Sequence, residues 1–239
     1  MREVPNVGYK VGELQANYTI NELNKGQKGI YKLNPGENLV MINGDIKDPN
    51  THFIAKGWFD RLDTSFKNKK LNLIFPTDGD IKNPEYFIDN WDGEKAAQKV
   101  KELLKNYQDN IQIVLVAKDG MANKIIGILG DKIRKILITG QDGSAQSARN
   151  IVENHQGITI YKPSKLLAEK TVELVVALSN GEDTQYLITT KDIKTTNGNI
   201  IPSHLLAPIP ITKEDLKILI EDSIITQKQL CQGIKETCP

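Results

Sequence analysis

The chain has 239 residues, of which 39% are hydrophobic and 26% are charged, as is ordinary for a soluble globular protein. Its 31 basic residues balance 30 acidic ones, so the net charge of +1 gives no electrostatic footprint for nucleic acid or for an anionic membrane. No apolar run approaches the roughly 18 to 20 residues that cross a membrane. The N-terminus lacks the apolar core of a secretory signal, so the chain as written would stay in the cytoplasm.

Helical and strand patterns alternate through the first two thirds of the chain. The expected helices are 10–24, 51–67, 94–107, 121–129 and 145–153, and the expected strands are 39–42, 71–75, 111–117, 136–139 and 158–161. Such alternation is typical of parallel βαβ units with right-handed crossovers. We therefore predict an α/β fold, in which an open parallel sheet carries helices on both faces.

The pattern changes after residue 161. The later elements are a helix at 166–178, strands at 186–195 and 200–206, and a helix at 213–222. Thr196-Asn-Gly between the two strands is a strong hairpin signal, and Thr212 is suited to cap the last helix. Pro208 and Pro210 favour an extended segment between hairpin and helix.

Two cysteines, Cys231 and Cys238, lie within the last nine residues, with no Cys-x-x-Cys motif or histidine cluster beside them. This pattern predicts neither a metal site nor a cofactor. A disulfide between them would close a short loop and stabilise little of the fold. We therefore expect free thiols on a frayed terminus.

The stretch at 135–167 carries the clearest candidate binding groups. Gly140 lets the chain turn after a predicted strand, so Asp142 lies just past the carboxyl end of that strand, and Lys162 stands at the end of the next strand. Ligands bind at this edge of open α/β sheets, because its loops line a crevice and the following helices begin with free N–H groups. Asp142 and Lys162, which have opposite charges, are therefore expected at the same edge of the sheet.

Several short motifs follow one another in a family-specific order. They are Val11-Gly-Glu-Leu-Gln-Ala, Asp89-Asn-Trp-Asp-Gly-Glu-Lys-Ala, Val116-Ala-Lys-Asp, Thr139-Gly-Gln-Asp, a helix with Arg149, Gly157-Ile-Thr-Ile-Tyr-Lys-Pro, Leu166-Leu-Ala-Glu, and Asn197-Gly through Ile211-Thr-Lys. Together they resemble the bacterial D-xylose-binding proteins, the substrate-binding components of ABC sugar transporters. The resemblance covers about residues 9–230.

The resemblance implies a non-catalytic protein that binds D-xylose or a similar monosaccharide and delivers it to an ABC permease. It also implies a location outside the cytoplasm, in the periplasm or on a lipid anchor. Family members carry a long further segment ahead of this region, which builds most of their first lobe. This chain is then expected to comprise a second-lobe βαβ domain at 1–161, part of an incomplete N-terminal lobe at 162–190, and a returning hairpin, hinge strand and C-terminal helix at 191–239.

The missing first lobe has a consequence for the amphipathic helix. In the two-lobed proteins this helix packs on strands of the first lobe. The apolar face of 166–178 therefore has no obvious partner in the sequence, and each exposed leucine or valine forgoes roughly 1.5 to 3 kcal/mol. We expect a segment near 163–185 to be mobile, shifted, or buried against a partner or another copy, with self-association through 166–178.

The resemblance also implies a ligand site. Trp91 would stack on the sugar ring, Asp142 would accept hydrogen bonds from two hydroxyls, and Lys162 would donate from the hinge. Asn50 and His52 follow the first strand at the same edge, where solvated loop positions are the simpler interpretation, and Asn50 is kept as a candidate.

Two departures from the family pattern weaken the predicted site. Asn6-Val7-Gly8 stands where the family has an acidic residue, which removes a sugar acceptor. Lys118 stands where the family has an amide, which would put a cation in the cleft, the alternative being a surface salt bridge. Each lost charged hydrogen bond costs roughly 1.5 to 3 kcal/mol, so we expect weaker sugar binding than in a complete family member.

Other functions compete with sugar transport. Ser144, Asp142 and His155 could be drawn as a hydrolase triad, but Gly-x-Ser-x-Gly is absent and His155 falls at the end of the helix that Ser144 begins. The turn Gly140-Gln-Asp-Gly-Ser could hold a nucleotide or phosphate, although the carboxylate in it argues against an anion. A sugar-sensing partner of a membrane receptor kinase stays open, because no docking motif separates sensing from transport.

Overall fold

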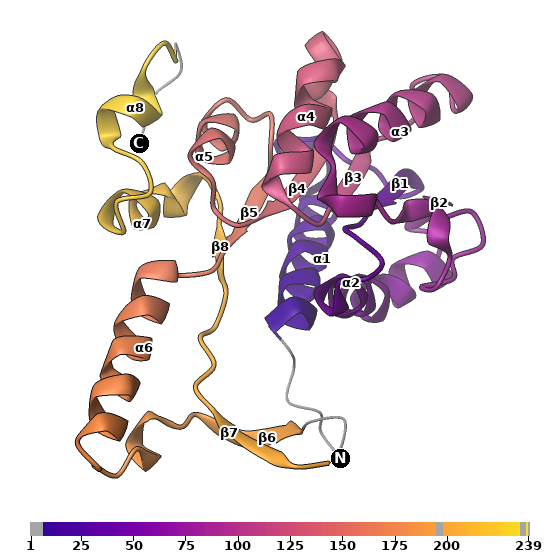
Figure 1. The fold of residues 1–239 in the computed structure, drawn as a ribbon. Coiled ribbons are helices and arrows are strands. Elements are labelled where there is room, and N and C mark those ends of the chain that lie inside the picture. Colours follow the sequence, from indigo (N-terminus) through magenta and orange to yellow (C-terminus); the bar gives the residue numbers. More distant parts are fainter. Residues whose placement is uncertain (1–6, 195–197, 235–237, 239) are drawn as a thin grey trace.

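A computed structural model of the chain describes residues 7–194, 198–234 and 238 (Figure 1). The strands are β1 Glu37–Ile42, β2 Leu71–Phe75, β3 Ile113–Val116, β4 Leu137–Gln141, β5 Ile158–Tyr161, β6 Thr190–Lys194, β7 Ile200–Ser203 and β8 Ile209–Ile211. The helices are α1 Val7–Lys25, α2 Pro49–Lys67, α3 Gly93–Asn106, α4 Asp119–Leu129, α5 Ala145–Val152, α6 Ser164–Ser179, α7 Leu216–Glu221 and α8 Gln227–Cys231.

Six of these strands form one sheet, in the order β2-β1-β3-β4-β5-β8. The first five are parallel, and β8 is antiparallel to β5. Helices α1 and α2 pack together on one face, and α3 and α4 pack together on the other (Figure 1). The predicted α/β fold is confirmed, with an antiparallel edge strand added.

The edge strand β8 lies in the region where an extended segment and a hinge strand were expected, but its antiparallel pairing with β5 was not. Pro210 lies opposite Ile160 in the antiparallel pair. Proline is tolerated there because an edge strand leaves one row of its N–H groups without a sheet partner. The last predicted helix is also divided, into a turn at Lys213–Asp215 and helix α7.

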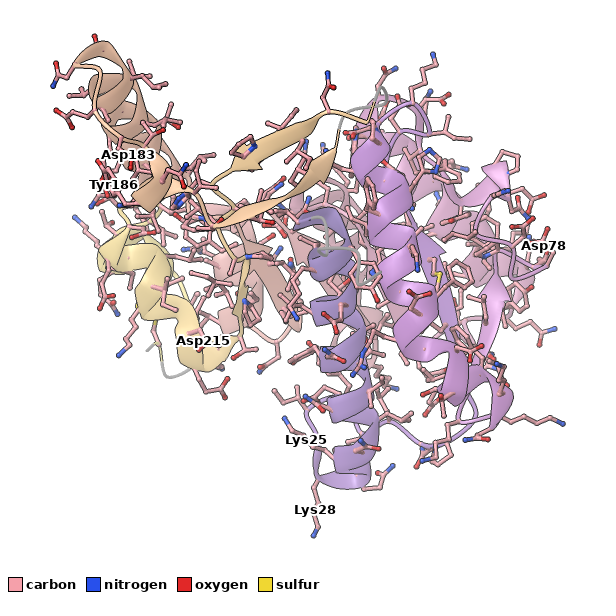
Figure 2. All side chains as sticks on the ribbon, turned by 90° about the horizontal axis from the view of Figure 1, so that it is seen from below. Lys25, Lys28, Asp78, Asp183, Tyr186 and Asp215 are labelled. Atoms are coloured by element: carbon pink, nitrogen blue, oxygen red, sulfur yellow. A yellow bond between two sulfur atoms is a disulfide. The ribbon has the colours of Figure 1, made fainter. Side chains whose placement is uncertain are left out.

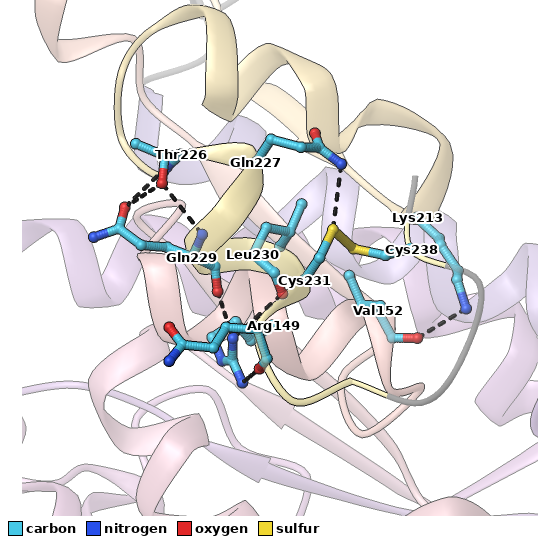
Figure 3. Close-up of a disulfide and its surroundings, with 10 residues drawn as sticks. Arg149, Val152, Lys213, Thr226, Gln227, Gln229, Leu230, Cys231 and Cys238 are labelled. Carbon is cyan, nitrogen blue, oxygen red and sulfur yellow. Dashed lines mark hydrogen bonds between the residues drawn. A yellow bond between two sulfur atoms is a disulfide. The ribbon is translucent and has the colours of Figure 1, made fainter.

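The prediction of free thiols at the C-terminus is wrong. Cys231 and Cys238 form a disulfide, with their Cα atoms 5.6 Å apart (Figure 3). The unanticipated helix α8 is held in place because its Leu230 is fully buried beside α5. Arg149 of α5 donates to the backbone carbonyls of Gln229 and Gln232, which fixes the end of α8 (Figure 3).

Helix α6 and the hairpin β6–β7 extend away from the main sheet (Figure 1). Among the described side chains of α6, only Ala177 is buried. Figure 2 shows the α6 end of the molecule, where Asp183 and Tyr186 lie, from a second direction. The exposed apolar residues of α6 are Leu166, Leu167, Val172, Val175, Val176 and Leu178.

The helix expected at 166–178 is therefore present, and its apolar side chains are exposed. Self-association through 166–178 stays a prediction. The expected turn residues Thr196 and Asn197 lie outside the described part of the chain. None of the described helices is long and apolar enough to span a membrane.

Close packing of α1 on α2 depends on two glycines. A Cβ atom on Gly12 would lie 2.1 Å from the carbonyl oxygen of Ile54, and one on Gly57 would lie 2.3 Å from that of Tyr9. Both distances are well below van der Waals contact. The two backbones can therefore approach only where neither residue carries a side chain.

A pair of glycine substitutions tests this packing. Gly57→Ala should lower the free energy of unfolding by roughly 1 to 3 kcal/mol, because the added methyl meets backbone that cannot move aside locally. Gly127→Ala is the matched control: it also lies within a helix, but its Cβ would meet nothing within 4 Å. That variant should gain about 0.5 to 1 kcal/mol from helix propensity. Denaturant unfolding measures both, and equal effects would refute the packing argument.

Candidate functional site

A cavity opens at the carboxyl edge of the sheet, where β1, β3, β4 and β5 end. Its volume is about 210 Å³, and its lining residues are Val7, Gly8, Asp48, Asn50, Trp91, Lys118, Gln141, Asp142 and Lys162. All five side chains expected from the sequence thus surround one space. Their role in binding stays a prediction. At the hinge, Val7 and Gly8 line the same cavity, while Asn6 lies outside the described residues.

Trp91 is held by the loop between β2 and α3. The backbone N–H of Trp91 donates to the Ile88 carbonyl at 3.0 Å, and the N–H of Asn90 donates to the Asp45 carboxylate at 2.7 Å. A Cβ atom on Gly44 would lie 2.3 Å from the indole ring, so glycine is required for the ring to approach the end of β1. The indole therefore packs against its own domain and also lines the cavity.

Asp142 and Lys162 meet across the ends of β4 and β5. Lys162 Nζ lies 3.2 Å from Asp142 Oδ1. The backbone angle φ of Asp142 is 110°, a value that residues other than glycine rarely adopt. The Asp142 N–H donates to the Ile160 carbonyl at 2.9 Å. Backbone strain of this kind concentrates at ligand sites. Both charged groups are partly exposed, so the pair adds little stability and keeps hydrogen-bonding capacity for a ligand.

Lys118 lies at the end of β3 and is the residue just before α4. It is half-buried, and its Nζ lies 5.8 Å from the centroid of the Trp91 ring. Within the described part of the chain, the Lys118 ammonium forms no ion pair or hydrogen bond. The structure thus places it in the cavity rather than in the alternative surface salt bridge.

The first turn of α2 contributes less. Asn50 lines the cavity but is exposed, and its amide donates to Asp48 Oδ1 at 3.1 Å. The same carboxylate caps the first turn of α2. His52 lies outside the cavity lining, in helix α2 rather than in the expected loop, and its ring contacts the Ile46 carbonyl at 2.8 Å.

Gln141 is a lining residue that the sequence analysis did not single out. It is the last residue of β4, and only 6% of its surface is exposed. An amide both donates and accepts hydrogen bonds, which suits a hydroxyl ligand. The sequence did contain a signal for Gln141, because it stands directly before Asp142 in one of the motifs that carry the family resemblance.

Beneath the cavity, Asp119 joins three segments of the strand edge. This carboxylate is 1% exposed and accepts hydrogen bonds from the Ser144 N–H at 2.8 Å, the Thr159 hydroxyl at 2.9 Å and the Gln156 amide at 3.1 Å. Burial raises the pKa of Asp119 to about 6, while the three donors lower it. A Cβ atom on Gly140 would lie 2.1 Å from Asp119 Oδ1, so only glycine fits there.

The arrangement gives no support to the hydrolase triad. The Ser144 hydroxyl accepts from the Ser147 N–H at 3.1 Å and caps α5. His155 lies instead near Glu153, with Nδ1 3.7 Å from a carboxylate oxygen. Among the described residues, no group of three or more His, Cys, Asp or Glu side chains could hold a metal ion.

Comparison with known proteins identifies the family. Residues 6–183 match the periplasmic binding protein domain. The chain belongs to this family. It is similar to the D-xylose-binding periplasmic protein of Haemophilus influenzae, at 28% identity over 225 residues that cover 92% of this chain and 60% of the relative. It is also similar to the multiple sugar-binding periplasmic receptor ChvE of Rhizobium radiobacter, at 29% identity over 93% of this chain and 62% of the relative.

The chain thus spans about three fifths of the length of these curated relatives. Among solved structures, it is similar to an ABC transporter solute-binding protein of Clostridium phytofermentans with bound β-D-glucose. The TM-score is 0.76 and the identity 23%, over 93% of this chain and 68% of that one. At this identity the likeness shows the fold alone. The family resemblance drawn from the motifs is confirmed, and the relatives are named as binding proteins and receptors rather than enzymes.

The buried carboxylate gives a pH-dependent stability. A carboxyl whose pKa is raised on folding binds its proton more tightly in the folded state, so its contribution is present below about pH 3.8 and is lost as the pH rises through about 6. Relative to Asp119→Asn, which does not titrate, the unfolding free energy of the wild type should fall by roughly 3 kcal/mol across this window. Denaturant unfolding of both proteins at a series of pH values measures the difference. A difference that stays constant with pH would contradict the assignment.

Proposed function

We propose that this chain is a non-catalytic binding module for a monosaccharide, used in ABC-type uptake. The observation that carries the proposal is the meeting of Trp91, Asp142 and Lys162 around one cavity at the carboxyl edge of the sheet. A sugar needs a flat apolar surface for its C–H face and polar groups that donate to and accept from its hydroxyls. The indole supplies the first, and the ion pair supplies the second.

The relatives guide the choice of sugar. One is named for D-xylose, another for multiple sugars, and one similar structure holds D-glucose. D-xylose is our first candidate. We expect the affinity for D-xylose to be low. The chain lacks the acidic residue that the D-xylose-binding proteins have at the position of Asn6-Val7-Gly8, and it has Lys118 in the cavity.

The cellular role follows from the same relatives. We propose a location outside the cytoplasm and an ABC permease as partner, since the relatives are named as periplasmic proteins. The relative from Rhizobium radiobacter is named a receptor, which supports the alternative of a sugar-sensing partner of a membrane kinase. A nucleotide or phosphate is disfavoured by the Asp142 carboxylate in the turn after β4. Self-association through α6 would appear as a concentration-dependent sedimentation coefficient.

Calorimetry with D-xylose, D-ribose and D-glucose tests the proposal on this chain. At least one aldose should bind, and Asp142→Asn should weaken binding about tenfold or more, because a charged acceptor is lost. Trp91→Ala should weaken it as well, through the lost stacking surface.

Asp63→Asn is the matched control for the carboxylate. Asp63 pairs with Lys67 at 2.7 Å on the exposed side of α2, outside the cavity lining, so this change should leave binding unaltered. The proposal fails if all three sugars fail to bind while a nucleotide binds.

A further inference from the structure

One charged side chain around the cavity has no partner of opposite charge among the described residues. Its lining includes two carboxylates, Asp48 and Asp142, and two ammonium groups, Lys118 and Lys162. Lys162 pairs with Asp142 at 3.2 Å. Asp48 Oδ1 is engaged at the start of α2, where it accepts from the Asn50 N–H at 2.9 Å and its negative charge is favoured by the helix N-terminus. Lys118 is left as a cation with no carboxylate partner within the described residues.

The position of Lys118 gives this charge an effect on a ligand. The residue precedes the first turn of α4, where the helix end adds its own positive potential. The side chain is half-buried, so water screens it less than it screens a surface lysine. Its Nζ lies 5.8 Å from the Trp91 ring centroid, so a ring stacked on the indole would bring its substituents close to the ammonium.

We propose that the ligand preferred by this site is a monosaccharide ring that carries one carboxylate, a uronate, and that Lys118 determines this preference. The inference rests on the proposed monosaccharide function. A neutral aldose offers the Lys118 ammonium only an uncharged hydroxyl oxygen as acceptor, whereas a carboxylate supplies an acceptor of opposite charge and a stronger hydrogen bond.

The size and charge of the cavity agree with a small ligand of single charge. Its volume of about 210 Å³ lies below the roughly 300 to 1,000 Å³ typical of sites for drug-sized ligands, which suits one sugar ring. One unpaired ammonium matches a single negative charge. A sugar phosphate, with a charge of about −1.5 to −2 at neutral pH, would leave part of its charge without a partner.

Three sugars form a matched series for the test. D-xylose, D-glucose and D-glucuronate share one pyranose ring and carry hydrogen, hydroxymethyl and carboxylate at the same ring carbon. In calorimetry at low ionic strength, D-glucuronate should bind about tenfold more tightly than either neutral sugar. D-glucose 6-phosphate should bind less tightly than D-glucuronate.

Variants assign the preference to one side chain. Lys118→Asn should abolish the preference for D-glucuronate and improve binding of D-xylose, whereas Lys118→Arg should keep the preference because the charge is retained. Lys101→Asn on α3, outside the cavity lining, is the control for loss of a positive charge elsewhere and should change nothing.

The failures of the two proposals can be told apart. If a neutral sugar binds and D-glucuronate binds no more tightly, or if Lys118→Asn keeps the preference, the inference is wrong and the monosaccharide function stands. Tighter binding of D-glucose 6-phosphate than of D-glucuronate would also overturn it. If none of the three sugars binds, the monosaccharide function itself fails.

Discussion

The buried carboxylate of Asp119 is the interaction on which the strand edge depends. It ties the start of α4 to β5 through Thr159 and to the loop before α5 through the Ser144 N–H. That loop carries Asp142, so the position of the proposed sugar acceptor is set by a group that does not itself line the cavity. A buried charge is tolerated there because three donors surround it. The cost of its burial appears in the raised pKa of Asp119.

A second set of contacts fixes the edge from the other face of the sheet. Gln15 of α1 donates to the carbonyls of Val116 and Gly140, and it accepts from the Trp58 indole at 2.7 Å. The ends of β3 and β4 are therefore held by α1, while Asp119 holds β5 and the loop before α5. Side chains on a backbone that is held by α1 and Asp119 in this way need little reorganisation when a ligand binds. A low reorganisation cost favours the binding of small ligands, because these make few contacts.

Local sequence patterns predicted the βαβ body, because helix and strand periodicity reflects which side chains face the core. They also placed Lys118, Asp142 and Lys162 at strand ends, which meet at one edge of a parallel sheet. Trp91 lies in a loop, and only the resemblance to the sugar-binding family pointed to it. The role of Asp119 was missed because its partners lie 25 to 40 residues away in the sequence. The pairing of β8 with β5, helix α8 and the disulfide were missed for the same reason: each depends on packing against β5 or α5 rather than on local pattern.

The central claim is that a monosaccharide stacks on Trp91 at this edge, and the two tryptophans of the chain allow a direct measurement. Trp58 is fully buried between α1 and α2, whereas Trp91 lines the cavity. In an NMR titration with D-xylose and D-glucuronate, the indole N–H signal of Trp91 should move while that of Trp58 stays in place. The contradictory result would be an unmoved Trp91 signal with shifts at Tyr18 and Tyr31, which line a separate hollow of about 540 Å³ beside α1.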